Sequence, residues 1–260
     1  MNNLASKKNR GSPLIGFNLA FPSPDMVEFM GILGFDYVFI DCEHIAFNIE
    51  SVQACVRAAE LTGMLSIARV IKNDPEVILG YLEVGVKGIL VPHIKTATDA
   101  QAAVDAVKYY PLGKRGAGGR SRAAKYGADL PAEEYYKEVN ASTFVLLMIE
   151  EAEALKNLPE ILEVPGVDYL DFGPHDMALS LGYTEAEDIG QVRELIKDAK
   201  EAVRNSDKGY VAPVACLKDG LKAARDGASL IEFDTNSIIK TQAQQFLEQI
   251  KNIHNGEKND

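Results

Sequence analysis

The stretch FVLLMIE at residues 144–150 decides the fold, together with YLDFGPHD at residues 169–176. Each begins as a short apolar run, ends in polar residues, and is followed by sequence of helical character. Such a run is typical of a strand that is covered on both faces in a parallel sheet. Neighbouring strands lie about 4.8 Å apart, so Glu150 and Asp176, at the ends of these two, could bind one divalent cation.

Eight strand-like runs occur along the chain: 14–20, 37–44, 65–70, 88–94, 144–150, 169–174, 210–215 and 230–235. Amphipathic helical stretches separate most of them, at 49–61, 75–84, 97–109, 189–205, 217–226 and 238–250. The expected helix N-caps are Asn48, Asp74, Thr96 and Thr235.

Alternating strands and helices predict a parallel sheet with right-handed crossovers, and eight units in about 250 residues is the size of a (β/α)₈ barrel. A doubly wound open sheet lacks support, because no Gly-rich dinucleotide loop follows the first strand. We therefore predict a single α/β domain over residues 1–260, a (β/α)₈ TIM barrel. Residues 111–142 are expected to form a long loop insertion and residues 255–260 a disordered tail.

The composition of the chain restricts the kinds of molecule that it is expected to bind. The net charge is −11, from 38 acidic and 27 basic residues, which argues against a nucleic-acid partner. No apolar stretch is long enough to cross a bilayer, and the polar N-terminus lacks the apolar core of a signal peptide. We expect a cytoplasmic protein. The three cysteines have no metal-like spacing and are expected to be small buried residues.

The active site of such a barrel lies at the carboxyl ends of its strands. Three of the four histidines are expected there, His44, His93 and His175. The other polar residues expected on this rim are Asp41, Glu43, Arg69, Glu150, Asp176 and Asp234.

Glu150 and Asp176 offer the hard oxygen ligands that magnesium and manganese prefer. Zinc remains possible because His93 and His175 are near. The alternative is that both acids are solvated loop residues or helix caps.

His44 is a candidate general base, and Asp41 could fix its tautomer and raise its basicity. The alternative is a structural histidine. The planar fork of Arg69 suits a carboxylate or enolate oxygen, although an ion pair with Glu43 or Asp41 would also explain a buried arginine. The loop from Lys114 to Arg122 either binds an anion or is merely flexible.

Together these residues resemble the metal-dependent (class II) aldolases of the HpcH/HpaI family, over roughly Pro13 to Ile250. The matching segments are GFDYVFIDCEH at 34–44, ARVIKNDP at 68–75, LEVGVKGILVPHI at 82–94, YYPLGKRGAG at 109–118, MIEEAEALKNLPEIL at 148–162 and GVDYLDFGPHDMALSLGY at 166–183. The resemblance implies a barrel of the phosphoenolpyruvate/pyruvate type. It also implies retro-aldol cleavage of a 4-hydroxy-2-keto acid to pyruvate and an aldehyde, in the catabolism of aromatic or sugar acids.

On the family pattern, Glu150 and Asp176 hold a magnesium, manganese or cobalt ion that the pyruvate enolate chelates. Arg69 stabilises the enolate oxygen, and His44, made more basic by Asp41, removes the proton from the C4 hydroxyl. The backbone at Gly173, Pro174 and His175 contacts the pyruvate carboxylate. The lack of an obvious Schiff-base lysine at a strand end also favours the metal route.

Two positions depart from the family pattern. Met148 stands where many members have glutamine, and a thioether cannot donate the hydrogen bond of an amide. His175 stands where many members have alanine or serine, and is expected to contact substrate; the alternatives are an extra metal ligand and a loop residue of which only the backbone matters.

The family implies a homo-oligomer, with a hexamer favoured, in which the last helix packs on a neighbouring barrel and Glu83 reaches towards the adjacent subunit. The competing functions are oxaloacetate decarboxylation, citrate-lyase-like cleavage of a thioester and a non-catalytic oxo-acid binding protein. The presence of both His44 and Asp41 argues against the last, because binding alone needs no base.

Overall fold

The computed structural model describes residues 12–128, 131–183 and 188–256. Within these residues, eight parallel strands close into a barrel in chain order, each paired with the next and β8 with β1. The strands are β1 Leu14–Asn18, β2 Tyr37–Asp41, β3 Leu65–Arg69, β4 Gly88–Val91, β5 Phe144–Ile149, β6 Tyr169–Phe172, β7 Gly209–Val214 and β8 Leu230–Phe233. The predicted (β/α)₈ TIM barrel is confirmed, and every strand lies within its predicted run to within one residue at its start and three at its end.

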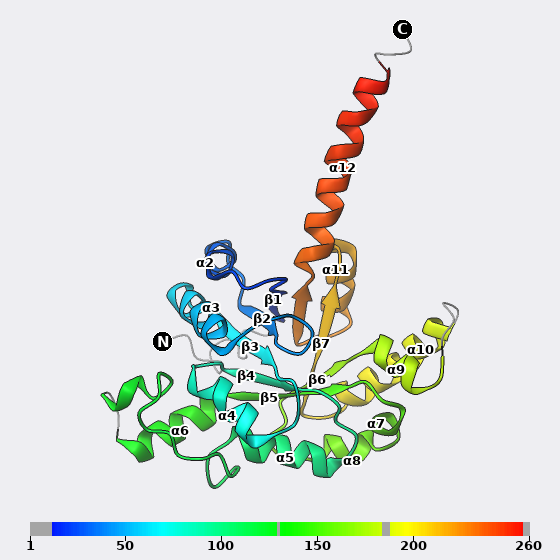
Figure 1. Cartoon of the computed structure of the whole chain (residues 1–260). Helices are drawn as coiled ribbons and strands as arrows, with labels where there is room; N and C mark the ends of the chain where they lie inside the picture. Colours follow the sequence, from blue (N-terminus) through cyan, green and yellow to red (C-terminus); the bar gives the residue numbers. More distant parts are fainter. Residues whose placement is uncertain (1–11, 129–130, 184–187, 257–260) are drawn as a thin grey trace.

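Helices follow the strands (Figure 1). They are α2 Pro24–Ile32, α3 Ile49–Thr62, α4 Pro75–Glu83, α5 Ala97–Val107, α6 Ala132–Ser142, α7 Ala152–Lys156, α8 Leu158–Leu162, α9 Pro174–Ser180, α10 Asp188–Arg204, α11 Leu217–Arg225 and α12 Thr235–Gly256, with a 3₁₀ turn at Lys125–Gly127. Of these, α2 and α6 were not predicted from the sequence. Helical sequence without stated bounds was expected after β5 and β6, where α7, α8 and α9 lie.

Three predicted N-caps are confirmed and one is displaced. Asn48 accepts a hydrogen bond from the Ser51 N–H, Asp74 caps α4, and Thr96 forms a reciprocal capping box at the start of α5. Thr235 was the wrong choice for α12. The carboxylate of the preceding Asp234 accepts the first free N–H groups of that helix, while the Thr235 hydroxyl bonds to the backbone oxygen of Asn18.

The segment 111–142 is not a continuous loop, because it contains the 3₁₀ turn and α6. The end of α6 is fixed to the chain after α5. The buried ammonium of Lys108 donates to the backbone oxygens of Asn140 and Thr143, and the Asn140 carboxamide bonds to both backbone groups of Tyr109. α12 is also longer than expected, so residues 255–256 of the expected tail are helical, and 257–260 lie outside the described residues.

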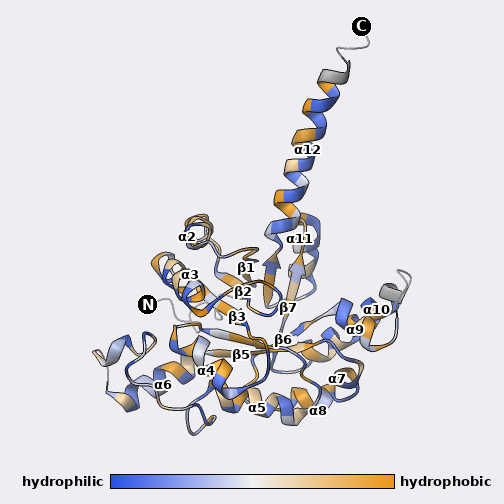
Figure 2. Cartoon of the chain, in the orientation of Figure 1, coloured by the Kyte–Doolittle hydropathy of each residue, from blue (hydrophilic) through white to orange (hydrophobic). Residues whose placement is uncertain are grey.

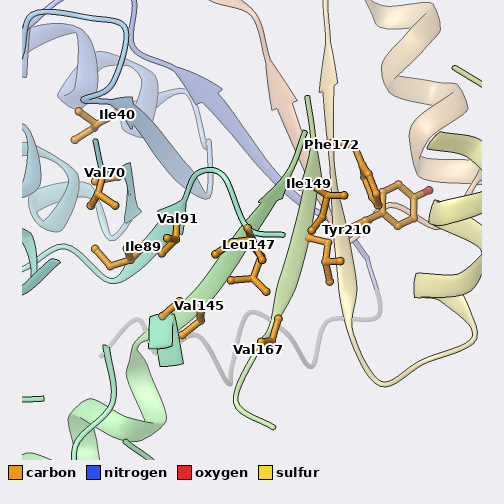
Figure 3. Packing of buried hydrophobic residues seen from close by; sticks show 14 of the residues in the cluster. Ile40, Val70, Ile89, Val91, Val145, Leu147, Ile149, Val167, Phe172 and Tyr210 are labelled. Atoms are coloured by element: carbon orange, nitrogen blue, oxygen red, sulfur yellow. The ribbon is translucent and has the colours of Figure 1, made fainter. Parts of the chain in front are cut away.

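Apolar side chains cover both faces of the strands. The outer faces pack against the helices, as Figure 3 shows for Ile40, Val91, Ile149 and Phe172. A second cluster fills the barrel interior; it consists of Leu14, Tyr37, Phe39, Leu65, Ile67, Leu90, Phe144, Leu146, Met148, Tyr169, Val211 and Leu230. Burial on both sides explains why the strands read as continuous apolar runs.

α12 extends away from the barrel (Figure 1), and apolar and polar residues alternate along it (Figure 2). Its exposed apolar residues are Ile239, Phe246, Leu247, Ile250 and Ile253. Among the described helices, none combines the length and the apolar character that crossing a membrane requires.

Candidate active site

The carboxyl ends of β2, β3, β5 and β6 carry the residues predicted for the site. Asp41 and Arg69 are the last residues of their strands and are register partners in the sheet. Glu150 directly follows β5, and Gly173 follows β6 as the N-cap residue of α9. Asp176 lies in the first turn of α9. The barrel therefore places these residues on the same rim.

Arg69 is bound to Asp41 through two parallel hydrogen bonds. Its Nε lies 2.9 Å from Oδ1 and its Nη2 lies 2.5 Å from Oδ2. Burial alone would raise the pKa of Asp41, but the hydrogen bonds and charge of Arg69, with two backbone N–H groups, hold it below its usual value. Asp41 is therefore an ionised partner that fixes the arginine fork.

Asp41 contacts His44 through the backbone rather than through the ring. Its Oδ1 accepts from the His44 N–H at 3.3 Å and from the Glu43 N–H at 3.1 Å. The His44 imidazole is 62% exposed, and its Nε2 lies 3.7 Å from Oε2 of Glu43. The expected carboxylate–imidazole contact is thus replaced by the Arg69 pair, and the ring of His44 is exposed to solvent.

Glu150 is a buried carboxylate with a perturbed pKa. It is 2% exposed. Burial raises its pKa, and the negative charges of Glu43 and Asp176 raise it further, against the opposing effects of the His93 N–H and ring. A cation beside Glu150 and the exposed Asp176 would offset this excess of negative charge.

The donor set fits a hard divalent cation held by few protein ligands. Carboxylate oxygens suit magnesium or manganese, which usually keep several waters. Among the residues that the structure describes, no three His, Cys, Asp or Glu side chains are grouped as a ready-made metal site. Two carboxylates, Glu150 and Asp176, would leave coordination positions open for a substrate.

The sequence indicated Glu43 only as a possible ion-pair partner of Arg69, left the role of His93 open, and gave Glu151 no role. The Glu43 side chain lies 3.3 Å from Nε of Arg69 and 3.6 Å from Nε2 of His93. Its Oε2 is buried and has no hydrogen-bond partner among the described residues. The His93 ring lies 3.2 Å from both Glu150 and Glu151. The only feature of the sequence that pointed to Glu43, His93 and Glu151 was their position at the ends of predicted strands.

The two residues that depart from the family pattern differ in burial, because Met148 is buried and His175 is exposed. Met148 is buried inside the barrel, in register with Asp171. A Cβ on Gly173 would stand 2.9 Å from Cβ of Glu150 and 3.7 Å from Sδ of Met148, so the thioether lies close to Gly173. His175 is exposed in α9, beside Pro174 at its N-terminus.

Two buried acids in the barrel interior were not predicted. Asp171 of β6 and Glu232 of β8 are each largely removed from water. Burial raises the pKa of Asp171 to about 6 and that of Glu232 well above its usual value, while Arg69 acts in the opposite sense on both. Asp171 therefore keeps its proton up to about pH 6, and burial favours the protonated form of Glu232.

The cations of the Lys114–Arg122 loop are largely paired. Lys114 contacts Asp105 at 2.5 Å, Arg115 contacts Glu83 at 2.9 Å, and Arg122 bonds to Glu60 and to the backbone oxygen of Val84. These partners lie at the ends of helices that run back to the amino ends of the strands, away from the candidate active site. These contacts favour a structural role for the loop over anion binding.

The sequence model of the family described as HpcH/HpaI aldolase/citrate lyase matches residues 15–250. The chain belongs to this family. A 2-dehydro-3,6-dideoxy-6-sulfogluconate aldolase of Pseudomonas putida is 36% identical over 74% of each chain. A 2-keto-3-deoxy-L-rhamnonate aldolase of Klebsiella pneumoniae is 31% identical over 90% of this chain and 87% of its own. The crystal structure of an HpcH/HpaI aldolase from Desulfitobacterium hafniense superposes with a TM-score of 0.87, at 26% identity over 96% of both chains.

These relatives are carbon–carbon lyases, and this member of the HpcH/HpaI family is a class II aldolase. The family assignment agrees with the rim of carboxylates, arginine and histidine. It does not favour the decarboxylase or the non-catalytic binding protein.

Proposed function

We propose that this aldolase cleaves a 4-hydroxy-2-keto acid to pyruvate and an aldehyde at a divalent cation held by Glu150 and Asp176. The observation that carries the proposal is the burial of Glu150 beside Glu43 and Asp176, since a bound cation would offset the repulsion among these carboxylates. Magnesium, manganese and cobalt are the candidates, because the ligands are hard oxygens.

When bound, the cation would supply a Lewis acid that draws electrons towards the 2-keto group of the substrate. The N–H groups of His175 and Asp176, in the first turn of α9, are suited to the substrate carboxylate, because the first N–H groups of a helix are unpaired. The Gly173 N–H already donates to the backbone oxygen of Ile149, and Pro174 has no N–H. His175 and Met148 border this region and are the proposed contacts that set substrate preference.

Arg69 stabilises the negative charge that develops during cleavage. Its Nε and Nη2 bond to Asp41, which leaves N–H groups of the five-donor guanidinium for an enolate oxygen. Because Asp41 holds the fork in place, little reorganisation is needed as the charge forms.

His44 is the general base. It takes the proton from the C4 hydroxyl, directly or through water, the C3–C4 bond breaks, and its electron pair passes into the enolate while C4 becomes the aldehyde. Protonation of C3 then gives pyruvate. The exposed ring of His44 is open to a substrate at the barrel mouth.

The substrate class follows from the relatives. Their names include a sulfogluconate, a rhamnonate and a 4-hydroxy-2-oxo-heptane-1,7-dioate aldolase. We propose a 2-keto-3-deoxy sugar acid, or a related acid from aromatic catabolism, as the substrate.

We further propose a cytoplasmic homo-oligomer, with a hexamer as the favoured order. The cysteines are free thiols, as in a reducing compartment. The exposed apolar residues of α12 need a covering surface, and a second copy of the barrel is the proposed one.

The test is an assay of pyruvate release coupled to lactate dehydrogenase. Purified protein is incubated with magnesium, manganese or cobalt and a panel of 4-hydroxy-2-keto acids. We expect metal-dependent pyruvate release from at least one. Release of pyruvate only from oxaloacetate would favour the decarboxylase, and no release at all would contradict the proposal.

A further inference from the structure

His93 has an unusual backbone conformation. Its φ is 56°, in the left-handed region, where non-glycine residues are uncommon. This conformation directs its N–H to Oε1 of Glu150, at 2.9 Å. Strained backbone of this kind persists where the surroundings determine it and is concentrated at functional sites.

The ring of His93 lies among three carboxylates. Its Nδ1 is 3.2 Å from Oε1 of Glu150 and 3.2 Å from Oε1 of Glu151, and its Nε2 is 3.6 Å from Oε1 of Glu43. With a proton on Nδ1, the ring donates to Oε1 of Glu151, and the same nitrogen lies at ion-pair distance from Oε1 of Glu150. His93 thus joins the ends of β2, β4 and β5.

The two oxygens of Glu150 therefore have different surroundings. Oε1 is held by the backbone and ring of His93. Oε2 faces Gly173, where a Cβ would stand 3.1 Å away, at the start of the helix that carries Asp176. Because Gly173 has no side chain, space remains beside Oε2 of Glu150, at the start of the helix that carries Asp176.

We propose that His93 is a positioning residue, which acts on the metal through Glu150: it holds Oε1 so that Oε2 is presented towards Asp176 before the cation binds. The proposal rests on the proposed function, in which Glu150 is a metal ligand. Hydrogen bonds to a ligating carboxylate orient it, and their loss typically lowers metal affinity by about 10- to 100-fold. Neither composition nor strand spacing indicated this role.

The test is calorimetric titration of Mg²⁺, Mn²⁺ and Zn²⁺ into wild-type protein and His93→Gly. Glycine adopts a positive φ without strain, so this variant keeps the backbone N–H and removes only the ring. We expect Mg²⁺ and Mn²⁺ affinity to fall about tenfold or more. His93→Asn, which tolerates the left-handed region and can donate through its amide, should recover part of the loss. The matched control is Tyr126→Gly, which removes an exposed side chain at φ 59°.

Circular dichroism and thermal melting establish that each variant is folded, and His93→Ala provides a second ring deletion. Affinities of the folded ring deletions within twofold of wild type would overturn the positioning role. Loss confined to Zn²⁺ would overturn it too, because His93 would then be a direct nitrogen ligand. Failure of the wild-type protein to bind any cation would overturn the proposed function as well, and is visible before any variant is compared.

Discussion

Arg69 and Asp41, 28 residues apart in the chain, are joined by hydrogen bonds of 2.9 and 2.5 Å at the ends of neighbouring strands. The pair uses the carboxylate that would otherwise bind the imidazole of His44. Asp41 therefore fixes the arginine and holds the loop of Glu43 and His44 through two N–H bonds. One acid thus positions both the proposed base and the proposed charge-stabilising arginine.

Replacing Asp41 with asparagine should destabilise the protein in a pH-dependent way. The pKa of Asp41 is lowered in the folded protein, so its stabilising contribution is present above the unfolded value, near 4, and is lost as the pH falls through the folded value. We expect a loss of about 2 kcal/mol at pH 7, typical of hydrogen bonds to a charged group. Urea unfolding at several pH values measures it. If Asp41→Asn loses as much unfolding free energy below pH 4 as at pH 7, the lowered pKa of Asp41 is contradicted.

Replacing Asp171 with asparagine should have the opposite pH dependence. Its pKa rises to about 6 on burial, so the folded protein loses stability as the pH rises from the unfolded value through 6. The free energy of unfolding of Asp171→Asn, measured relative to wild type, should rise by about 3 kcal/mol between pH 4 and pH 8. This figure follows because a shift of one pKa unit corresponds to about 1.4 kcal/mol. The exposed Asp198→Asn is the control in the same unfolding series, and an equal gain in both variants would refute the burial argument.

His44→Ala should separate two activities. Cleavage should fall by about 10²- to 10⁴-fold, the usual contribution of a general base. Exchange of the pyruvate methyl protons, followed by NMR in D₂O, should fall much less, since it involves no C4 hydroxyl. Equal losses in cleavage and exchange would show that His44 does not act at that hydroxyl.

Charged substitutions on α12 should change the assembly. Phe246 and Leu247 are exposed on the helix that extends from the barrel. Glutamate at either position should shift the mass measured by light scattering towards smaller species, because a charge opposes burial at an apolar contact. The exposed Gln244→Glu, on the same helix, is the control. An unchanged mass in the Phe246 and Leu247 variants would exclude α12 from the contact.

The barrel was predictable because its strands are buried on both faces. FVLLMI, for example, has no polar residue to obscure the pattern, and Ile149 faces the helices while Met148 faces the interior. α6 was not recognised because its sequence is polar overall and buries only Val139, and its position depends on Lys108 and Asn140, which make tertiary contacts.

The site was only partly predictable. Position at strand ends indicated Glu150, Arg69 and His44. The sequence indicated an ion pair of Arg69 with Asp41 only as one of two alternatives, because the pairing depends on strand register, which a single sequence does not reveal. The contacts of His93 depend on its left-handed backbone, and Asp171 is buried only because β6 turns it into the barrel.

The most direct test of the central claim is metal-dependent pyruvate release by Glu150→Gln and Asp176→Asn, compared with Glu153→Gln, an exposed acid of α7. Each change removes one carboxylate charge and keeps the side-chain shape. We predict that the first two variants lose metal-dependent turnover and that Glu153→Gln retains it. Turnover at the wild-type rate in both Glu150→Gln and Asp176→Asn would contradict the account.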